Sequence, residues 1–475
     1  MTQMKKNIII LIGIVTLACS SCTKNFEEIN TSPNSPEVAP ATNVFGYTIQ
    51  SIAQRFGSAE LFYPGAFVGY TAKGTYNLVN RYAEVAPTSH WNNLNTYGIS
   101  NLNSVIKEAS ATGNNNLKAA AMVLRAYAFQ MLVDAYGPVP YAESGKLVEG
   151  IVYPKYDTEK DIYTSLFASL KEANTLFNSS ATQKIGVGDL IYAGNVTKWK
   201  KFCNSMRLRL AIRISKVDQA TAASHISEIL NDATTFPVFT SNADNAILKF
   251  PGGDWLEPWA SAYKSVPDVK IAKPIVTTMN TFADPRLPFY AQTNAAGKYV
   301  GLEVGADANG SNESKVAVAF MQTDAGTVFF QRYTEVEFIR AEAAKRGFIA
   351  TSAQTAYNNA IKASCDEYAI PAAAYKTYIE TAGIAWADDL NQIYTQKWIA
   401  LFRQCWEAWA EMRRTDVPLL GPAVNTAYSG HNRTPFRLSY PIEERNLNPN
   451  VPASVTEKDM FWGYKVWWDT RTGVQ

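Results

Sequence analysis

The segment Leu117–Tyr136 constrains the fold of this chain more than any other part of its sequence. Its apolar residues recur at spacings of three and four, the period of an α-helix with a buried face. They are Leu117, Ala120, Ala121, Leu124, Ala128, Met131, Leu132 and Ala135. Gly137 and Pro138 follow directly, and they end a helix because glycine supplies a C-cap and proline cannot continue the hydrogen bonding. The segment therefore predicts a long helix that packs against other elements.

Further segments carry helical patterning, and several of them form pairs with short connections. They are Phe45–Phe56, Trp91–Ala109, Thr158–Phe177, Trp199–Ser215, Thr334–Arg346, Ala353–Ala369 and Leu390–Arg414. Helix pairs that lie in two clusters favour tetratricopeptide-like hairpins, although the sequence shows no regular textual repeat. We predict a mostly α architecture.

Between the two helical clusters, the stretch Asn231–Gln322 has a different composition. It is rich in Gly, Pro, Asn and aromatic residues and shows little helical periodicity. Insertions of this kind on a helical scaffold are where binding surfaces commonly lie, so we expect a loop-rich ligand-binding insertion here. The C-terminal stretch Gly421–Gln475 is also loop-rich.

The N-terminus has the pattern of a secretory signal. Lys5 and Lys6 precede the mostly apolar run Ile8–Ala18, and small residues and cysteines follow. A short basic region, an apolar core and small residues before a cysteine are typical of a lipoprotein signal peptide. The apolar run is far shorter than the ~20 residues that cross a bilayer, so a transmembrane anchor is disfavoured.

We predict that Cys22 is the lipidated residue and carries a diacylglyceryl group with fatty acids such as palmitate. Ser20 and Ser21 precede it and are small, as the peptidase requires, although Cys19 occupies a position where leucine is commoner. Cys19 is the alternative, and cleavage without lipidation is a third possibility. The predicted division is a signal peptide at 1–21, a flexible lipidated tether at 22–40 and a helical domain at 41–475, with the insertion at about 231–322.

The charge balance disfavours a nucleic-acid partner. The whole chain has a formal net charge of +2, from 44 basic and 42 acidic residues. Lys5 and Lys6 are the only charged residues before Cys22, so the processed chain has 42 of each sign. Nucleic-acid binding needs a basic surface that releases counterions, and a neutral chain offers no overall drive for it.

The remaining cysteines and the histidines indicate neither a disulfide framework nor a metal site. Beyond the leader lie Cys203, Cys365 and Cys405 and three histidines, at 90, 225 and 431. An odd number of widely separated cysteines in apolar segments reads as buried small side chains. The wide Cys/His spacing is also unlike a zinc site. We expect no metal and no cofactor.

Several aromatic residues are candidates for ligand contact, and each also has a packing interpretation. Trp91 and Asn93 open a predicted helix, where an indole can stack on a sugar and an amide can bind a hydroxyl. Trp255 and Trp259 lie in a Gly- and Pro-rich loop, and Tyr70 lies in another aromatic stretch together with Phe67 and Tyr76. The alternative for each of them is a place in the core.

The segment Leu390–Arg414 carries a contrasting set of aromatic residues. Trp398, Phe402, Trp406 and Trp409 recur at helical spacing and are predicted to be core. Arg413 and Arg414 could bind a carboxylate bidentately. The favoured interpretation is that they end a helix and pair with nearby acidic residues, Glu407 or Glu411.

The sequence carries no strong catalytic signature. The most conspicuous carboxylates, Glu335, Glu337 and Glu342, lie on a predicted scaffold helix. A nucleophile-elbow motif, a Walker-type loop and a His-Glu-x-x-His motif are all absent from the sequence. Counting carboxylates alone does not exclude a glycosidase pair. We expect a protein that is not an enzyme.

Motifs spread over nearly the whole processed chain resemble those of SusD/RagB-family outer-membrane lipoproteins, in the family's order. They are Cys22-Thr-Lys-Asn-Phe-Glu-Glu-Ile-Asn-Thr-Ser-Pro-Asn34, Leu124-Arg-Ala-Tyr-Ala-Phe129, Tyr136-Gly-Pro-Val-Pro-Tyr141, Asp189-Leu-Ile-Tyr-Ala-Gly-Asn-Val-Thr-Lys-Trp199, Asn204-Ser-Met-Arg-Leu-Arg-Leu210, Asp284-Pro-Arg-Leu-Pro288, Glu335-Val-Glu-Phe-Ile-Arg-Ala-Glu-Ala343, Gln396-Lys-Trp-Ile-Ala-Leu-Phe402, Trp409-Ala-Glu-Met-Arg-Arg-Thr415, Tyr440-Pro441 and Trp467-Trp-Asp469.

The resemblance implies a SusD-like fold in which tetratricopeptide-like units form a scaffold for loops. It also implies a surface lipoprotein of the outer membrane that captures oligosaccharides and delivers them to a SusC-like TonB-dependent transporter. RagB-like members bind peptides, so a peptide ligand is the first alternative. A lipid-anchored glycan hydrolase and a scaffold that binds no ligand are further alternatives.

The intact mass of protein extracted from membranes tests the lipidation prediction. A diacylglyceryl group on Cys22 adds mass to a chain that begins at that residue. A chain that begins at Cys19, or that carries no lipid, would contradict the assignment.

Overall fold

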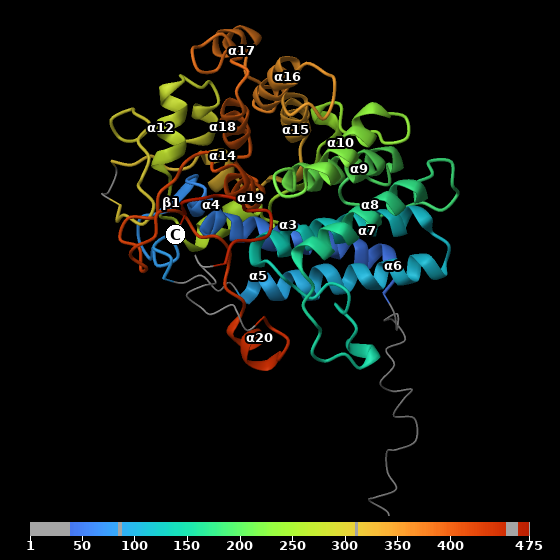
Figure 1. The fold of residues 1–475 in the computed structure, drawn as a ribbon. Helices are drawn as coiled ribbons and strands as arrows, with labels where there is room; N and C mark the ends of the chain where they lie inside the picture. The colour runs from blue at the N-terminus through green and yellow to red at the C-terminus, as the bar shows by residue number, and fades with distance from the viewer. Residues whose placement is uncertain (1–38, 84–87, 309–311, 453–463, 475) are drawn as a thin grey trace, which may run out of the picture.

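The computed structural model describes residues 39–83, 88–308, 312–452 and 464–474 (Figure 1). The predicted signal peptide, Cys19, Cys22 and nearly all of the predicted tether lie outside the described residues. Among the described residues no helix has both the length and the apolar character needed to cross a bilayer.

The first half of the described chain is a layer of packed helices. They are α3 (Ala41–Phe62), α4 (Pro64–Phe67), α5 (Thr88–Asn92), the π-helix η1 (Asn93–Ser100), α6 (Asn101–Ala111), α7 (Asn115–Tyr136), the 3-10 turn η2 (Leu147–Glu149), α8 (Glu159–Leu176), α9 (Val196–Arg213) and α10 (Gln219–Asn231). Successive helices pack on one another from α6 to α10, and α3 packs on α6 (Figure 1).

The helix predicted from the strongest periodicity is confirmed as α7. The Asn114 side chain caps its first turn by accepting a hydrogen bond from the Leu117 N–H. Gly137 ends it with φ +86°, a conformation that favours glycine. Nearly every residue of α7 is buried, because helices pack around it on several sides.

The second half adds helices over the other end of the molecule. They are η3 (Asn242–Asp244), α11 (Pro258–Ser265), α12 (Lys273–Thr281), α13 (Leu287–Tyr290), α14 (Val318–Met321), α15 (Tyr333–Lys345), α16 (Ala353–Asp366), α17 (Ala372–Ile379), α18 (Leu390–Ala400), α19 (Cys405–Thr415) and α20 (Ile442–Leu447). The expected pairs form: α8 packs on α9, and α15 packs on α16. The mostly α prediction is confirmed.

Two short antiparallel strand pairs bring distant segments together. β1 (Thr71–Lys73) pairs with β3 (Val269–Ile271), with Thr71 opposite Ile271. β2 (Ala246–Phe250) pairs with β4 (Gly326–Gln331). Both pairs join the predicted insertion to chain outside it, so the insertion is held to the rest of the fold near its start, by β2, and near its middle, by β3.

The insertion contains more helix than its composition indicated. We expected little helical structure over 231–322, but α11 and α12 lie there, with 8 and 9 residues. Each begins with proline in its first turn, a position where the missing N–H costs nothing. Helices this short complete little more than two turns, so their periodicity is hard to recognise in the sequence.

The prediction of one continuous helix over Leu390–Arg414 is wrong, because the chain breaks between α18 and α19. Arg403 has φ +74°, which an α-helix does not allow. Buried Arg332 donates from Nη2 to the backbone oxygens of Ala400, at 2.6 Å, and Phe402, at 3.1 Å. These bonds satisfy carbonyls that a continuous helix would have paired internally.

The aromatic residues of this region have the predicted core role. Trp398, Phe402, Trp406 and Trp409 are all buried in the main apolar cluster. Cys203, Cys365 and Cys405 are free and buried, as expected of small apolar side chains.

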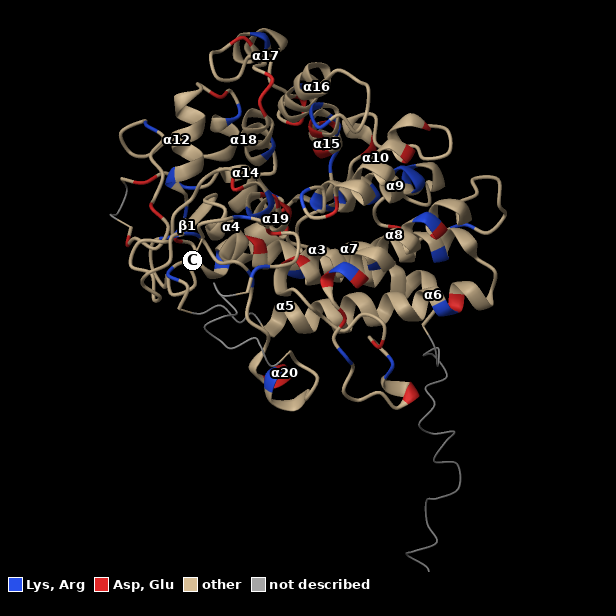
Figure 2. Ribbon diagram, viewed as in Figure 1, with Lys and Arg blue, Asp and Glu red and all other residues tan. Residues whose placement is uncertain are grey.

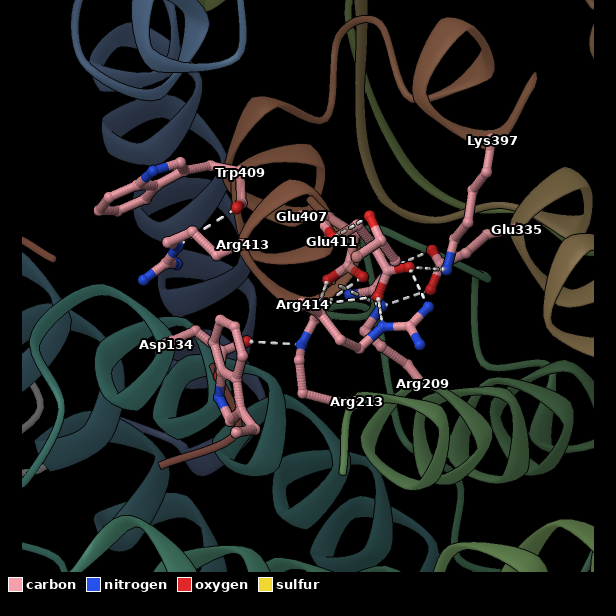
Figure 3. A network of polar contacts seen from close by, with 12 residues as sticks. Asp134, Arg209, Arg213, Glu335, Lys397, Glu407, Trp409, Glu411, Arg413 and Arg414 are labelled. Atoms are coloured by element: carbon pink, nitrogen blue, oxygen red, sulfur yellow. Dashed lines mark hydrogen bonds and ion pairs between the residues drawn. The ribbon is translucent and has the colours of Figure 1, made fainter. Parts of the chain in front are cut away.

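A network of buried ion pairs lies where α9, α15, α18 and α19 meet (Figure 3). Arg213 of α9 donates to Glu411 at 2.5 Å and to Glu407 at 2.7 Å. Arg209, one turn earlier, pairs with Glu335 of α15 at 2.5 Å. All five side chains are buried, so each charge depends on its partners rather than on water.

Arg414 and Lys397 complete the network. Arg414 donates to Glu342 and to Glu411, both at 2.7 Å, and Lys397 donates to Glu411 at 2.8 Å. Burial alone would raise the pKa of the Glu411 carboxyl. Arg414, Lys397 and Arg213 outweigh this effect and hold that pKa well below its ordinary value. The predicted pairing of Arg414 with an acidic neighbour is therefore confirmed.

Arg413 does not make the predicted ion pair. Its guanidinium lies 3.7 Å from the centre of the Trp409 ring and 4.9 Å from that of Trp468. It donates at 2.7 Å to the backbone oxygen of Phe436. Burial without a direct carboxylate partner lowers the pKa of Arg413 to about 9. The stacking of this cation on two indoles ties the C-terminal segment to α19.

Outside this network, charged residues of both signs are interspersed along the ribbon (Figure 2). They do not gather into separate acidic and basic halves in this view.

The buried network predicts a large penalty for removing one of its central charges. Glu411→Gln keeps the side-chain shape but leaves Arg213, Arg414 and Lys397 with one carboxylate fewer. We expect the free energy of unfolding to fall by about 3–5 kcal/mol in urea titrations.

The matched control for this variant is Asp366→Asn, which breaks the half-exposed pair with Lys362. We expect that variant to lose at most about 0.5 kcal/mol. Equal losses in the two variants would contradict the structural role assigned to the network.

Candidate functional site

The candidate site is a cavity of about 700 Å³ between the insertion, β4 and the end of α16. Ten of its sixteen lining residues come from 288–320, inside the predicted insertion. The others lie on β4, just after α16 and in the break between α18 and α19. The size is within the range of ligand pockets, so the cavity can hold a small ligand or one part of a longer one.

Aromatic rings form one wall of the cavity. Phe289 is 41% exposed, and its ring centre lies 5.5 Å from that of Tyr368. Tyr368 rests at 5.4 Å on buried Tyr290, which in turn stacks at 4.3 Å on Phe402. A partly exposed ring with a rigid aromatic column behind it provides a flat apolar surface at little entropic cost.

Polar groups lie on the other parts of the lining. Gln292 donates from its amide to the backbone oxygen of Val316 at 2.7 Å, which fixes the orientation of the side chain. Glu367 accepts from Arg332 at 2.8 Å. Thr327 adds a hydroxyl from β4. Few polar groups on a largely apolar wall are typical of a small-molecule site.

Arg403 forms part of the cavity floor, and the break between α18 and α19 places it there. Its guanidinium lies 4.4 Å from the ring centre of Trp259 and 4.9 Å from that of Phe320. It donates to Glu257 at 2.5 Å and to the Thr327 backbone oxygen at 3.2 Å. These contacts link the insertion, β4 and the helical scaffold around a single side chain.

A second carboxyl, Glu60 of α3, is buried near this arginine. Burial raises the pKa of Glu60 to about 8, although the Arg403 charge and two backbone hydrogen bonds oppose the shift. The group is therefore largely protonated at neutral pH in the folded protein.

Two of the predicted contact residues are fully buried and offer a ligand no surface. Tyr70 donates its hydroxyl to the backbone oxygen of Trp398 and stacks on that indole at 5.6 Å. Trp259 lies beneath Arg403 and packs against Phe402 at 5.8 Å. Trp259 thus supports the cavity floor from below rather than lining it.

The structure does not bring the other predicted residues to this cavity. Trp91 is buried against Tyr136 and Tyr440, at 5.0 and 5.6 Å, and borders a smaller cavity of about 380 Å³ beside α20. Asn93 lines a different cavity, on α3. Trp255 is 38% exposed on a tight turn.

The neighbours of Tyr70 in its aromatic stretch have opposite environments. Phe67 is buried, whereas Tyr76 is 87% exposed with φ +49°. Neither residue lines the cavity of 700 Å³.

Sequence reasoning missed Phe289, Tyr368, Glu367 and Arg403. The sequence carries one signal for Arg403: this charged residue directly follows Phe402 and interrupts the apolar pattern of the predicted helix. The others carry no local pattern, because they meet only through the tertiary fold.

No group of three or more His, Cys, Asp or Glu side chains arranged to hold a metal ion occurs within 39–83, 88–308, 312–452 or 464–474. The carboxylates that we weighed as a glycosidase pair face other partners. Glu335 and Glu342 lie in the buried network, and Glu337 binds Arg340 at 3.1 Å.

Comparison with known proteins identifies the family to which this chain belongs. The sequence profile of the SusD-like family described as starch-binding and associating with the outer membrane matches residues 33–441. A chitin-binding protein of known structure is 27% identical, with a TM-score of 0.80 over 91% of this chain and 100% of its own. A search of curated protein sequences found no match.

Further solved structures share the fold. A SusD homolog from Bacteroides uniformis is 25% identical, with a TM-score of 0.77 over 91% of this chain and 98% of its own. A chitin-binding SusD homolog from Flavobacterium johnsoniae is 23% identical, with the same TM-score and the same coverage. The chain therefore belongs to the SusD-like family, and the fold predicted from the sequence motifs is confirmed.

The raised pKa of Glu60 predicts an unusual pH dependence of stability. In the unfolded chain this carboxyl loses its proton near its ordinary pKa of 4.5, whereas in the folded protein it keeps the proton up to about pH 8. Its contribution to stability is therefore full below pH 4.5 and is lost as the pH rises through 8. We expect Glu60→Gln to be stabilised relative to the wild type, by an amount that grows between pH 5 and pH 9.

Urea unfolding at several pH values measures this difference. The control is Glu149→Gln, which changes an exposed carboxyl and should leave the pH dependence unaltered. Parallel stability curves for wild type and Glu60→Gln would show that the buried carboxyl is not protonated in the fold.

Proposed function

We propose that this protein is a non-enzymatic nutrient-binding lipoprotein and that the cavity of 700 Å³ holds part of an oligosaccharide. The observation that carries the proposal is the partly exposed ring of Phe289 backed by Tyr368, with Gln292, Glu367 and Thr327 on the same lining. An aromatic face takes the apolar side of a sugar ring, and the polar groups take its hydroxyls.

Two observations support attachment of this protein to a membrane: the predicted lipoprotein signal peptide and the description of the family. The predicted lipid on Cys22 would tether the folded body to a membrane, and the matching family is described as associating with the outer membrane. We propose that the protein lies on the outer face of that membrane and hands its ligand to a SusC-like TonB-dependent transporter.

The first ligand class to examine is N-acetylated glycan of the chitin type. The relative of 27% identity that spans nearly the whole chain is a chitin-binding protein. Starch-type glycans are the second class, since the family is described as starch-binding. Peptides, expected for a RagB-like protein, are the alternative ligand.

Binding calorimetry with chitohexaose, maltohexaose and a set of short peptides tests the proposal. We expect one of the oligosaccharides to bind, and Phe289→Ala to weaken that binding about two- to tenfold, because loss of an aromatic contact costs about 0.5–1.5 kcal/mol. Leu147→Ala, which removes another exposed apolar side chain, is the matched control and should bind as the wild type does.

Other outcomes separate the alternatives. Binding of peptides alone would favour the RagB-like function, and shortening of the bound glycan would favour a hydrolase. Unchanged binding in Phe289→Ala would remove this cavity as the site.

A further inference from the structure

A second cavity, of about 550 Å³, lies on the surface side of α3, where this helix faces α5 and the π-helix η1. It is separate from the cavity described above, because the two share no lining residue. Its lining is mainly aromatic rings, amides and hydroxyls, and the residues used below are Tyr47, Gln50, Gln54, Arg55 and Asn93.

The π-helix fixes one side of this cavity. Arg55 donates from Nη1 to the Asn93 side-chain oxygen at 3.0 Å, and its guanidinium lies 4.2 Å from the ring centre of Tyr97. Asn93 and Tyr97 both belong to η1. Segments of π-helix are rare and occur frequently at functional sites. Arg55 is thus held in one orientation before any ligand arrives.

The charge of the cavity has a single sign. Arg55 is the only charged residue among the eleven that line it. Within the described part of the chain, no carboxylate forms an ion pair with Arg55. A guanidinium has five N–H donors in a planar fork, and the bond to Asn93 uses one of them. The remaining donors suit an anion, and a carboxylate fits this fork bidentately.

The rest of the lining suits a sugar ring. Tyr47 is 48% exposed and holds its ring against the edge of Tyr97, with the ring centres 6.3 Å apart. Gln50 and Gln54 lie one turn apart on the same helix, so both amides face the same side. A partly exposed tyrosine can stack on a pyranose, and two amides can donate to and accept from its hydroxyls.

We propose that this cavity binds a carboxylate-bearing sugar residue, a uronic acid within a glycan, with its carboxylate on Arg55 and its ring on Tyr47. Gln50 and Gln54 bind the ring hydroxyls. The cavity therefore selects acidic glycans, whereas the cavity of the insertion presents charges of both signs. All of these contacts come from residues of α3 and η1, so the proposed site does not depend on which ligand the first cavity binds.

The test uses a hyaluronan hexasaccharide, which carries glucuronate residues, and the same hexasaccharide with its carboxylates reduced to alcohols. We expect the acidic form to bind in calorimetry and the reduced form to bind at least tenfold more weakly. Arg55→Gln should lower the affinity for the acidic form about tenfold. Lys107→Gln, which removes an exposed positive charge from α6, should leave that affinity unchanged.

The two protein variants alter exposed side chains, and thermal unfolding checks that both remain folded. Equal affinity for the acidic and reduced hexasaccharides would overturn the proposal, as would equal affinity of wild type and Arg55→Gln. A third arm uses the tripeptide acetyl-Ala-Ala-Ala with a free carboxylate. Arg55-dependent binding of this peptide without binding of the acidic hexasaccharide would also overturn the proposal.

Discussion

The buried charges of α9 hold the two helical halves of this protein together. Arg213 reaches the two glutamates of α19 and lies 3.3 Å from Asp134 of α7, and Arg209 reaches Glu335 of α15. Since these helices come from distant parts of the chain, the ion pairs fix how they meet. A buried pair need not stabilise more than an apolar contact would, but one lost partner leaves an uncompensated charge. The network therefore gives one arrangement of these helices a much lower free energy than arrangements that separate the buried charges.

The candidate site depends on the same region. Helix α18 carries Lys397 of the network in its last turn and ends at Ala400, and the break that follows carries Arg403 to the floor of the cavity. Arg332 satisfies the backbone oxygens that the break exposes, and it also holds Glu367 at the cavity wall. Scaffold and site are thus connected through two arginines. Substitutions in the break between α18 and α19 should alter the cavity, even though this break lies outside the insertion.

Sequence patterns predicted the helices well, because a helix with a buried face leaves a regular period in the chain. The break between α18 and α19 escaped this reasoning, since Leu401 and Phe402 continue the apolar pattern and only the two residues Arg403 and Gln404 interrupt it before Cys405 and Trp406. The residues of the candidate site were harder to predict than the helices. Trp259 and Tyr70 are aromatic residues in loop-like sequence, yet the structure buries both. Phe289 and Tyr368 meet through tertiary contacts that no local pattern records.

The most direct measurement is hydrogen–deuterium exchange of the full chain with and without a saturating oligosaccharide. If the ligand occupies the cavity of the insertion, backbone amides in 287–293, 317–329 and 365–368 should exchange more slowly in its presence. Amides of the scaffold helices α7 to α9 should change little. Slower exchange confined to other surfaces, or none in these three segments, would contradict the assignment of this cavity as the glycan site.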